Sequence, residues 1–308
     1  MSRVAKAAVG LMAATLVAKI LGFGRELALA SAYGASGVSD AFLVAMNIPA
    51  VIFTAIGTSL GTAFIPLYCE VNANKGEQSS NKFTNNVFNI VVIICIVISV
   101  IGAIFTPQIV KIFAVGFEGE TLRLAIYFTR VMILGLAFLG MSYIMMAYLQ
   151  VKENFIIPGF MSVPYNILII ISIIVSVKIS PYLLPWGTLI GLSLQFLFQL
   201  PFAIKKGYRY KLYIDVKDEH LKRMLWLIAP VLIGVAVNQI NTIVDRTIAS
   251  TLVEGSISAL NYATKLNQFV MGMFIVSISS VVYPMLSKLS SENNKEQFNK
   301  SIITSVNT

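Results

Sequence analysis

The sequence predicts an all-α protein, a polytopic bundle of transmembrane helices, and two observations indicate this class. Hydrophobic residues make up 57% of the 308 residues and charged residues only 12%, whereas a soluble domain carries roughly 25% charged residues. Several apolar segments also reach the roughly 20 residues that a helix needs to cross about 30 Å of hydrocarbon. Lipid must therefore act as part of the solvent, because one soluble core could not bury so much apolar surface.

Eight spans are expected along the chain. Their ends are marked by residues that are typical of turns. These are Tyr33 to Gly37, Asn72 to Gly76, Thr106-Pro107, Ser180-Pro181 and Glu254 to Ser256. The apolar N-terminus has no small-residue cleavage site, so it is interpreted as the first span and not as a removed signal peptide. The spans cover residues 5–32, 38–69, 83–105, 121–149, 155–177, 184–204, 223–251 and 257–287, and residues 301–308 resemble the first turns of a ninth helix.

Basic residues predict the orientation of the bundle, since Lys and Arg concentrate in cytoplasmic loops. The side that holds the N-terminus carries most of the loop Lys and Arg residues, including the run 205–223. The opposite side carries only Lys111, Arg123 and Lys178. We therefore expect a multi-pass protein of the plasma or inner membrane, with its N-terminus and the loop 205–222 in the cytoplasm.

The long polar loop is the expected boundary between two helical lobes. Residues 1–204 would form an N-terminal lobe of six helices, residues 205–222 a basic cytoplasmic linker, and residues 223–308 the beginning of a second lobe. His220, the single histidine, lies in the linker and is interpreted as a solvated loop residue.

An internal repeat supports this boundary. A shift of 219 residues places Glu26 on Asp245 and Ala30-Ser31 on Ala249-Ser250. Six helices separate the copies, so both would run in the same direction across the membrane, as in transporters built from parallel repeats. Chance similarity of small residues at helix ends is the alternative.

Composition also argues against other classes of protein. The net charge of +9 would suggest nucleic acid in a soluble protein, but here the charges lie mainly in short loops and no aromatic and basic groove is visible. Cys69 and Cys95 lie in or beside apolar helices, and no CxxC motif or Cys/His cluster accompanies them. Neither a disulfide framework nor a zinc site is indicated.

Ionisable residues inside the expected spans are the candidate functional residues. Each costs at least about 2.5–3.5 kcal/mol at the centre of a membrane helix, so we expect them to face a hydrated cavity or one another. The candidates for substrate binding are Lys19, Arg25, Glu26, Asp40 and Lys265, and further charged residues in the spans are Arg130, Asp245 and Arg246.

Structural roles remain open for several of these side chains. Lys19 and Glu26 lie seven residues apart, so they share a helix face and could neutralise each other. Asp40 could cap the N-terminus of the second helix. Asp245 and Arg246 could form a local pair.

The balance among the deep charges is cationic, which suits an anionic head group. Arginine offers a rigid fork for phosphate oxygens and lysine a mobile point charge. Gly and Pro residues interrupt several of the helices, for example Gly22, Gly24 and Pro49. Such breaks are tolerated where helices bend or line cavities, although close packing through small residues explains single glycines equally well.

The residues that carry these features resemble one family. Lys19-Ile-Leu-Gly-Phe-Gly-Arg-Glu26, Tyr33-Gly-Ala and Ser39-Asp-Ala-Phe-Leu-Val-Ala resemble the start of the MurJ (MviN) lipid II flippases, which belong to the multidrug/oligosaccharidyl-lipid/polysaccharide exporter superfamily. The resemblance continues in order through Pro164-Tyr-Asn-Ile, Tyr262-Ala with Lys265-Leu, and Pro284-Met-Leu-Ser-Lys288.

The resemblance implies two lobes of six helices and two final helices around a cationic cavity. By position, Arg25, Asp40 and Lys265 match the essential cavity charges of the family, and Lys19 matches a further basic position. Both lysines stand where members usually carry arginine. Phe53 stands where some members carry an arginine in helix 2, which leaves the details of head-group binding open.

The implied function is transport of lipid II, the lipid-linked peptidoglycan precursor, across the bacterial membrane by alternating access. The alternatives are a flippase for another undecaprenyl-linked polysaccharide unit and, less favoured because the cavity is cationic, a drug/cation antiporter of the same superfamily. A membrane enzyme such as a phosphoglycosyl transferase would need acidic or histidine clusters at cytoplasmic loop ends, whereas these loops are basic. We therefore expect a transporter and not an enzyme.

The expected partners are lipid II and membrane lipids, with no nucleic acid and no cofactor except a coupling sodium ion. Some members of the family hold sodium between helix 7 and later helices, and Asp245 occupies the matching position. The structural alternative for Asp245 is a salt bridge that docks helix 7. Most of the second lobe and the two final helices are absent from residues 1–308, so we expect that this chain alone does not transport.

Overall fold

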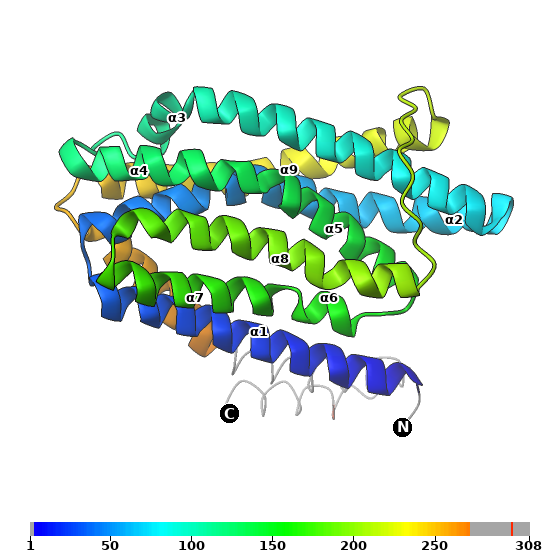
Figure 1. Cartoon of the computed structure of the whole chain (residues 1–308), viewed down its shortest axis with the longest axis horizontal. Helices are drawn as coiled ribbons and strands as arrows, with labels where there is room; N and C mark the ends of the chain where they lie inside the picture. Colours follow the sequence, from blue (N-terminus) through cyan, green and yellow to red (C-terminus); the bar gives the residue numbers. More distant parts are fainter. Residues whose placement is uncertain (1–2, 272–296, 298–308) are drawn as a thin grey trace. The chain divides into compact units, whose positions relative to one another are not determined.

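Helices form all the regular secondary structure in the computed structural model, which describes residues 3–271 and residue 297 (Figure 1). This confirms the predicted all-α class. The chain divides into two compact units, residues 1–259 and 260–308, and the labelled helices belong to the first unit. They are α1 (Arg3–Tyr33), α2 (Gly37–Ile104), α3 (Thr106–Phe113), α4 (Gly119–Met132), α5 (Leu136–Val151), α6 (Ile156–Phe160), α7 (Ser162–Lys178), α8 (Leu184–Lys205) and α9 (Glu219–Ser250), with short 3-10 turns η1 (Ile133–Gly135) and η2 (Pro181–Leu183).

Helix α2 doubles back on itself at Gly76. The backbone there has φ +77°, a conformation that glycine adopts without steric cost. The two arms then lie side by side, since the rings of Phe64 and Phe83 stack with centroids 5.7 Å apart. The predicted spans 38–69 and 83–105 are therefore the two arms of α2, and the bend falls at the predicted turn.

The later helical segments begin and end close to the predicted spans, but two of the predicted spans are each divided into two helices. The predicted span 121–149 corresponds to α4 and α5, which are joined through η1. The predicted span 155–177 is divided into α6 and α7 at Met161. Helix α3 was missed because Thr106-Pro107 reads as a turn, whereas Pro107 lies in its first turn, where the missing N–H costs nothing.

Five helices of the described residues are long and apolar enough to cross a membrane, and the shorter apolar helix Gly37–Val51 precedes them. They are Leu60–Ile104, Gly119–Val151, Ile156–Lys178, Pro181–Lys205 and Glu219–Ser250. The count of eight spans stays a prediction. Residues 257–271 of the predicted eighth span are helical, while its remainder and residues 301–308 lie outside the described residues.

The core of the first unit lies between the arms of α2 and helix α5. Tyr148 of α5 is fully buried, with its ring 5.8 Å from Tyr68 and 5.4 Å from Tyr208. On the outer side of the second α2 arm, apolar residues such as Ile93, Val97 and Ile101 are exposed. Apolar side chains face outwards along this arm, as expected for a helix in contact with lipid.

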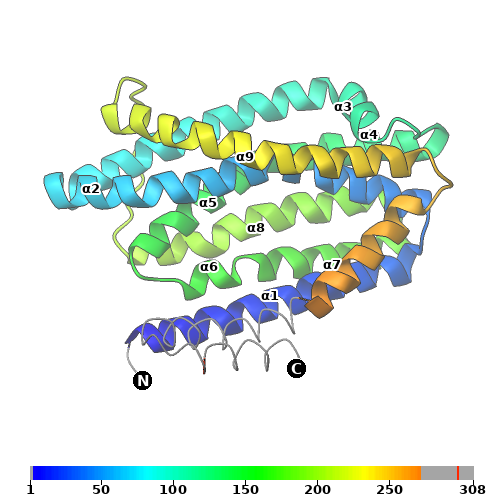
Figure 2. The ribbon, with the colours of Figure 1, turned by 180° about the vertical axis from the view of Figure 1, so that it is seen from behind.

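The two copies of the sequence repeat run in the same direction. Helices α1 and α9 point the same way in both views, and each is followed by a tight turn at the same end of the bundle (Figures 1 and 2). Helix α9 packs along α2 and α3. Along the sequence, the boundary between the two compact units falls after Ala259. The division into lobes at 205–222 stays a prediction.

Candidate functional site

A buried charge pair on α1 forms the centre of the site. Arg25 Nη2 lies 2.6 Å from Glu26 Oε1, and the side chains are only 16% and 6% exposed. Adjacent residues point about 100° apart on a helix, so the long arginine side chain turns back along the helix to reach its neighbour. Glu26 thus pairs with Arg25, whereas the sequence had suggested Lys19 as its partner; Lys19 is exposed on α1.

Helix α7 supplies the second partner of the arginine. Arg25 Nη1 donates to Asn166 Oδ1 at 3.3 Å, and the guanidinium carbon lies 6.0 Å from the centre of the Tyr165 ring. Asn166 Nδ2 donates to the carbonyl of Ser162 at 2.9 Å, which orients the amide. Sequence reasoning placed Tyr165 and Asn166 in a motif of the resemblance but gave them no role; a buried asparagine in an apolar helix was the available signal.

Asp40 joins the two copies of the repeat. Its Oδ2 accepts a hydrogen bond from the Gly255 amide at 2.8 Å, and its Oδ1 accepts one from the Ser258 amide at 2.7 Å. The carboxylate is buried. It therefore caps the helix that begins at residue 256, while the start of α2 is capped by Ser36. Asp40 therefore does cap a helix, as predicted. The capped helix is the one that begins at residue 256, in the second copy of the repeat, and not α2.

Two glycines allow the backbones at this end of the bundle to approach closely. Gly255 has φ +91°, and a Cβ there would lie 2.6 Å from the Ala35 carbonyl oxygen. A Cβ on Gly116 would lie 2.2 Å from the Ser250 carbonyl oxygen. The segments 34–37, 114–118 and 249–258 meet here, and we call this region the Asp40 end.

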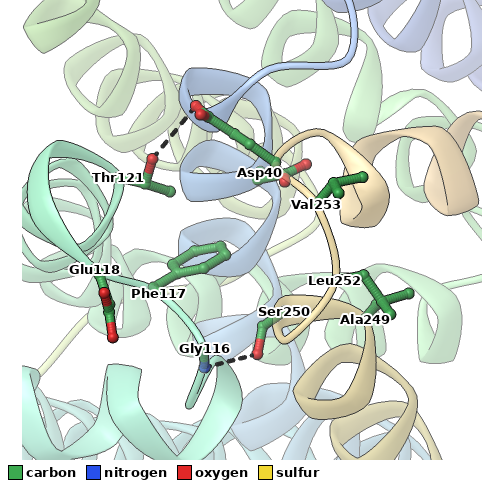
Figure 3. Close-up of a pocket in the computed structure, with 10 residues that line it drawn as sticks. Asp40, Gly116, Phe117, Glu118, Thr121, Ala249, Ser250, Leu252 and Val253 are labelled. Atoms are coloured by element: carbon green, nitrogen blue, oxygen red, sulfur yellow. Dashed lines mark hydrogen bonds between the residues drawn. The ribbon is translucent and has the colours of Figure 1, made fainter.

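A pocket of about 160 Å³ opens at the Asp40 end (Figure 3). Its lining includes Asp40, Glu118, Thr121 and Glu254. Across it, the Gly116 amide donates to Ser250 Oγ at 3.1 Å. No group of three or more His, Cys, Asp or Glu side chains that could hold a metal ion occurs in the described part of the chain.

Arg246 of α9 faces the charges of the first repeat. Its Nη1 is buried and has no hydrogen-bond partner among the described residues, and the carboxylates of Glu26 and Asp40 attract it electrostatically. Asp245, the predicted sodium ligand, is exposed. The local Asp245–Arg246 pair considered from the sequence is absent from the ion pairs of the described residues.

Two other positions from the sequence analysis have different surroundings. Lys265 belongs to the unit 260–308, where its Nζ donates to Gln268 Oε1 at 3.3 Å. Phe53 is buried and stacks on Tyr143 with ring centroids 5.3 Å apart. An arginine at position 53 would lose this aromatic contact. Phe53 therefore lies in locally apolar surroundings, in contrast to the arginine that some family members carry there.

Comparison with known proteins identifies the family. The family model for the lipid II flippase MurJ matches residues 29–308. A probable lipid II flippase MurJ from Buchnera aphidicola subsp. Acyrthosiphon pisum is 30% identical over 93% of this chain and 57% of its own length. The lipid II flippase MurJ of Burkholderia cenocepacia is 28% identical over 92% of this chain and 57% of its own length.

Solved structures agree with this assignment. A lipid II flippase MurJ in an inward closed conformation has a TM-score of 0.79 and 30% identity, over 96% of this chain and 61% of that structure. An outward-facing multidrug transporter of the MATE family has a TM-score of 0.64 at 15% identity, which indicates a shared fold alone. The chain spans somewhat more than half the length of the curated relatives that it matches, and on this evidence it belongs to the MurJ lipid II flippase family.

Proposed function

We propose that this chain is the N-terminal part of a flippase that carries lipid II across the bacterial inner membrane. The observation that carries the proposal is the match of the family model to residues 29–308, together with a buried charged site inside an apolar bundle. The relatives are named for lipid transport, which favours a transporter over an enzyme. Another lipid-linked polysaccharide unit with the same pyrophosphate is the second candidate cargo.

Arg25 would provide the principal contact with the pyrophosphate. Its guanidinium has five N–H donors, and Glu26 and Asn166 hold it in place through single hydrogen bonds. The remaining donors are available to phosphate oxygens. Arg246 supports the same role, because a buried donor without an acceptor costs roughly 1–3 kcal/mol and an entering anion would remove that cost.

Asp40 would hold one end of the cavity closed. Its two hydrogen bonds join segments more than 200 residues apart, and they must break if the two copies of the repeat separate. The distribution of Lys and Arg favours a topology in which the N-terminus is cytoplasmic and the Asp40 end is extracytoplasmic. Alternating access would then open the Asp40 end to release the cargo.

The test is transport by the full-length protein in cells depleted of their own flippase. We expect Arg25→Ala to lower the appearance of lipid II in the outer leaflet roughly 10- to 100-fold, because a hydrogen bond to a charged group contributes about 1.5–3 kcal/mol. Arg25→Lys should retain part of the activity. Arg123→Ala, at an exposed position near the start of α4, is the matched control. Unchanged transport by Arg25→Ala at normal expression would refute the site.

A further inference from the structure

The segment that connects α8 to α9 is extended and has no role in the proposed transport site. Residues 207–217, which we call the strap, follow Lys205 at the end of α8 and contain no helix. Figure 1 shows the strap at the end of the bundle where α2 bends. Burial raises the pKa of the Tyr208 hydroxyl, which donates to Asn85 Oδ1 at 3.0 Å.

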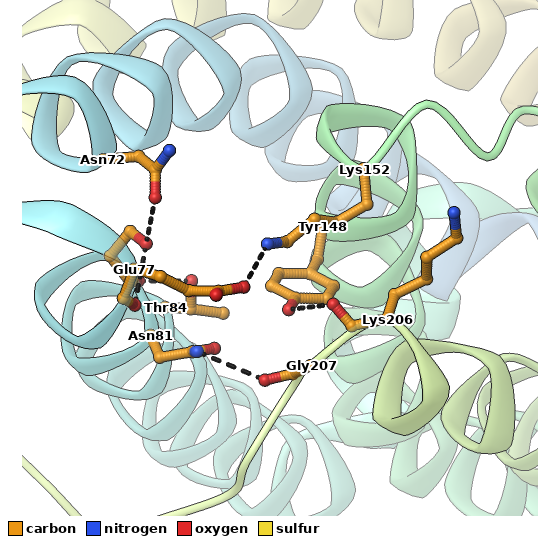
Figure 4. Close-up of polar contacts among 9 residues, drawn as sticks. Asn72, Glu77, Asn81, Thr84, Tyr148, Lys152, Lys206 and Gly207 are labelled. Atoms are coloured by element: carbon orange, nitrogen blue, oxygen red, sulfur yellow. Dashed lines mark hydrogen bonds and ion pairs between the residues drawn. The ribbon is translucent and has the colours of Figure 1, made fainter.

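Asparagines on the second arm of α2 hold the strap at a regular spacing. Four residues along a helix advance about 6 Å, and two residues along an extended chain advance about 6.6 Å. Side-chain amides at every fourth helix position therefore meet every second carbonyl of the strap. Asn81 donates to the Gly207 carbonyl at 3.2 Å (Figure 4), Asn85 to the Arg209 carbonyl at 2.8 Å, and Asn89 to the Lys211 carbonyl at 3.2 Å.

The strap reverses direction at Leu212. Asn89 also donates to the Tyr213 carbonyl at 3.0 Å, on the far side of this residue. Asn86 then exchanges two hydrogen bonds with the Asp215 backbone, at 2.9 and 2.7 Å. The strap thus runs from Asn81 towards Asn89 and returns, and Leu212 lies at its tip.

This pairing leaves an apolar row on the outer side of the strap. Tyr208 is buried, and the Tyr210 hydroxyl donates to Asn89 Oδ1 at 3.0 Å, so these two rings lie against α2. The next even-numbered residues are large, apolar and exposed, and they form the apolar row: Leu212 is 77% exposed, Ile214 48% and Val216 66%. Exposed apolar patches of this kind mark sites of contact with a partner or a membrane. Asn86 and Asn89 hold the backbone that carries this row, through the hydrogen bonds to Tyr213 and Asp215.

The position of the tip identifies lipid as the partner. Ile93 begins the exposed apolar row of the second α2 arm, and it lies one turn, or about 6 Å, beyond Asn89. Leu212, held through its neighbours by Asn89, is therefore at the edge of the lipid-facing surface. Trp226 of α9 is also highly exposed, as is typical of residues at the boundary between lipid and water.

The charges of the strap select a class of lipid. Its basic residues Arg209, Lys211 and Lys217 are exposed, as are Lys205 and Lys206 directly before it, while Asp215 is its single acidic residue. The Asp215 carboxylate is already used locally by the Tyr213 hydroxyl and the Lys217 amide. Clustered Lys and Arg next to membrane helices attract anionic lipids.

We propose that the strap is a membrane-interface anchor: its apolar row inserts into the lipid leaflet beside α2, and its exposed Arg and Lys bind the phosphates of anionic phospholipids. This goes beyond lipid II transport, because the lipids bound here stay in their leaflet. A soluble protein would be a different partner, and the first experiment distinguishes the two.

The depth of Leu212 can be measured directly in the full-length protein. Leu212→Trp, in a background where Phe replaces every native tryptophan, Trp186 and Trp226 included, is reconstituted into vesicles that contain phospholipid brominated on its acyl chains. We expect strong quenching of the new tryptophan by bromine and weak quenching by aqueous iodide. Lys75→Trp, exposed beside the bend of α2, is the control and should show the reverse. Quenching of Leu212→Trp by iodide alone would overturn the proposal.

The lipid preference is tested with the same tryptophan. Brominated phosphatidylglycerol should quench it more than an equal fraction of brominated phosphatidylcholine. Arg209→Gln with Lys211→Gln should reduce this preference, by roughly fivefold for each removed charge. Lys111→Gln with Lys178→Gln, at exposed positions outside the strap, is the matched control and should leave the preference unchanged. Equal quenching by both lipids would overturn the charge assignment. Neither readout depends on transport, so the proposed function can fail while the anchor stands.

Discussion

Asp40 shows how one carboxylate can serve two parts of a chain that are distant in sequence. A buried charge is tolerated only when its hydrogen-bonding capacity is used, and here both carboxylate oxygens accept from backbone amides of residues 255 and 258. These amides lie at the start of a helix, where backbone N–H groups lack partners within the helix and favour a negative charge.

We expect Asp40→Asn to destabilise the protein by about 1 kcal/mol, in the range of other lost helix caps. The neutral amide has one acceptor oxygen in place of two and carries no charge for the helix start. Thermal unfolding in detergent measures the effect. Glu118→Gln, in the same pocket, is the control and should change the melting temperature little. Equal melting temperatures for Asp40→Asn and the unmodified protein would exclude the capping role.

At the scale of elements, an ion pair links the bend of α2 to the end of α5. Lys152 Nζ, just after α5, lies 2.5 Å from Glu77 Oε1 (Figure 4). Glu77 directly follows Gly76, the residue at the bend. The hydrogen bond from Lys152 lowers the pKa of Glu77 below its usual value. Glu77 is largely exposed, so solvent screens the pair and its contribution to stability is small.

The lowered pKa predicts the direction of a pH dependence. The ionised form is favoured by folding, so the contribution of Glu77 is present above its unfolded pKa of about 4.3 and is lost as the pH falls through the lower folded value. We expect Glu77→Gln to lower the melting temperature slightly at pH 7, and we expect this difference to shrink as the pH falls below the unfolded pKa. Glu153→Gln, on the loop after α5, is the control. A difference for Glu77→Gln that stays constant as the pH is lowered would contradict the assignment.

For the whole molecule, α9 carries the start of the second copy of the repeat and packs along α2. Arg246 faces Glu26 and Asp40 of the first copy, while Asp245 points about 100° away on an ideal helix and is exposed. On this turn of α9, Arg246 interacts with charges of the first copy, while the Asp245 carboxylate is left accessible to a cation. We propose, from the family resemblance, that Asp245 is a ligand of a coupling sodium ion.

Sodium coupling is measured with the full-length protein in vesicles. We expect Asp245→Asn to lose the stimulation of transport by an inward sodium gradient, because the neutral amide removes the charge that attracts the cation. Glu254→Gln, an exposed carboxylate nearby, should keep the stimulation. If Asp245→Asn responds to sodium as the unmodified protein does, a docking role for Asp245 is favoured over ion binding.

Local patterns were sufficient for the fold class, most helix positions and the charged residues on α1. The thickness of the lipid core sets the length of an apolar span, so a window of about 20 residues contains the needed information. The bend at residues 72–76 and the direction of the repeat could also be read in this way. Helix α3 could not, because a proline marks either a turn or the first turn of a helix.

Contacts between distant segments were decided only by the tertiary structure. Asp40 caps a helix more than 200 residues away, Arg25 turns to Glu26 and Asn166, and Arg246 rather than Asp245 faces the first repeat. The asparagines at positions 81, 85 and 89 look like a polar face in the sequence, and their match to alternate carbonyls of the strap depends on how α8 ends and where α2 bends. Hydropathy determines which segments enter lipid, but the partner of a buried polar group depends on which segments pack together, and short sequence windows do not encode that packing.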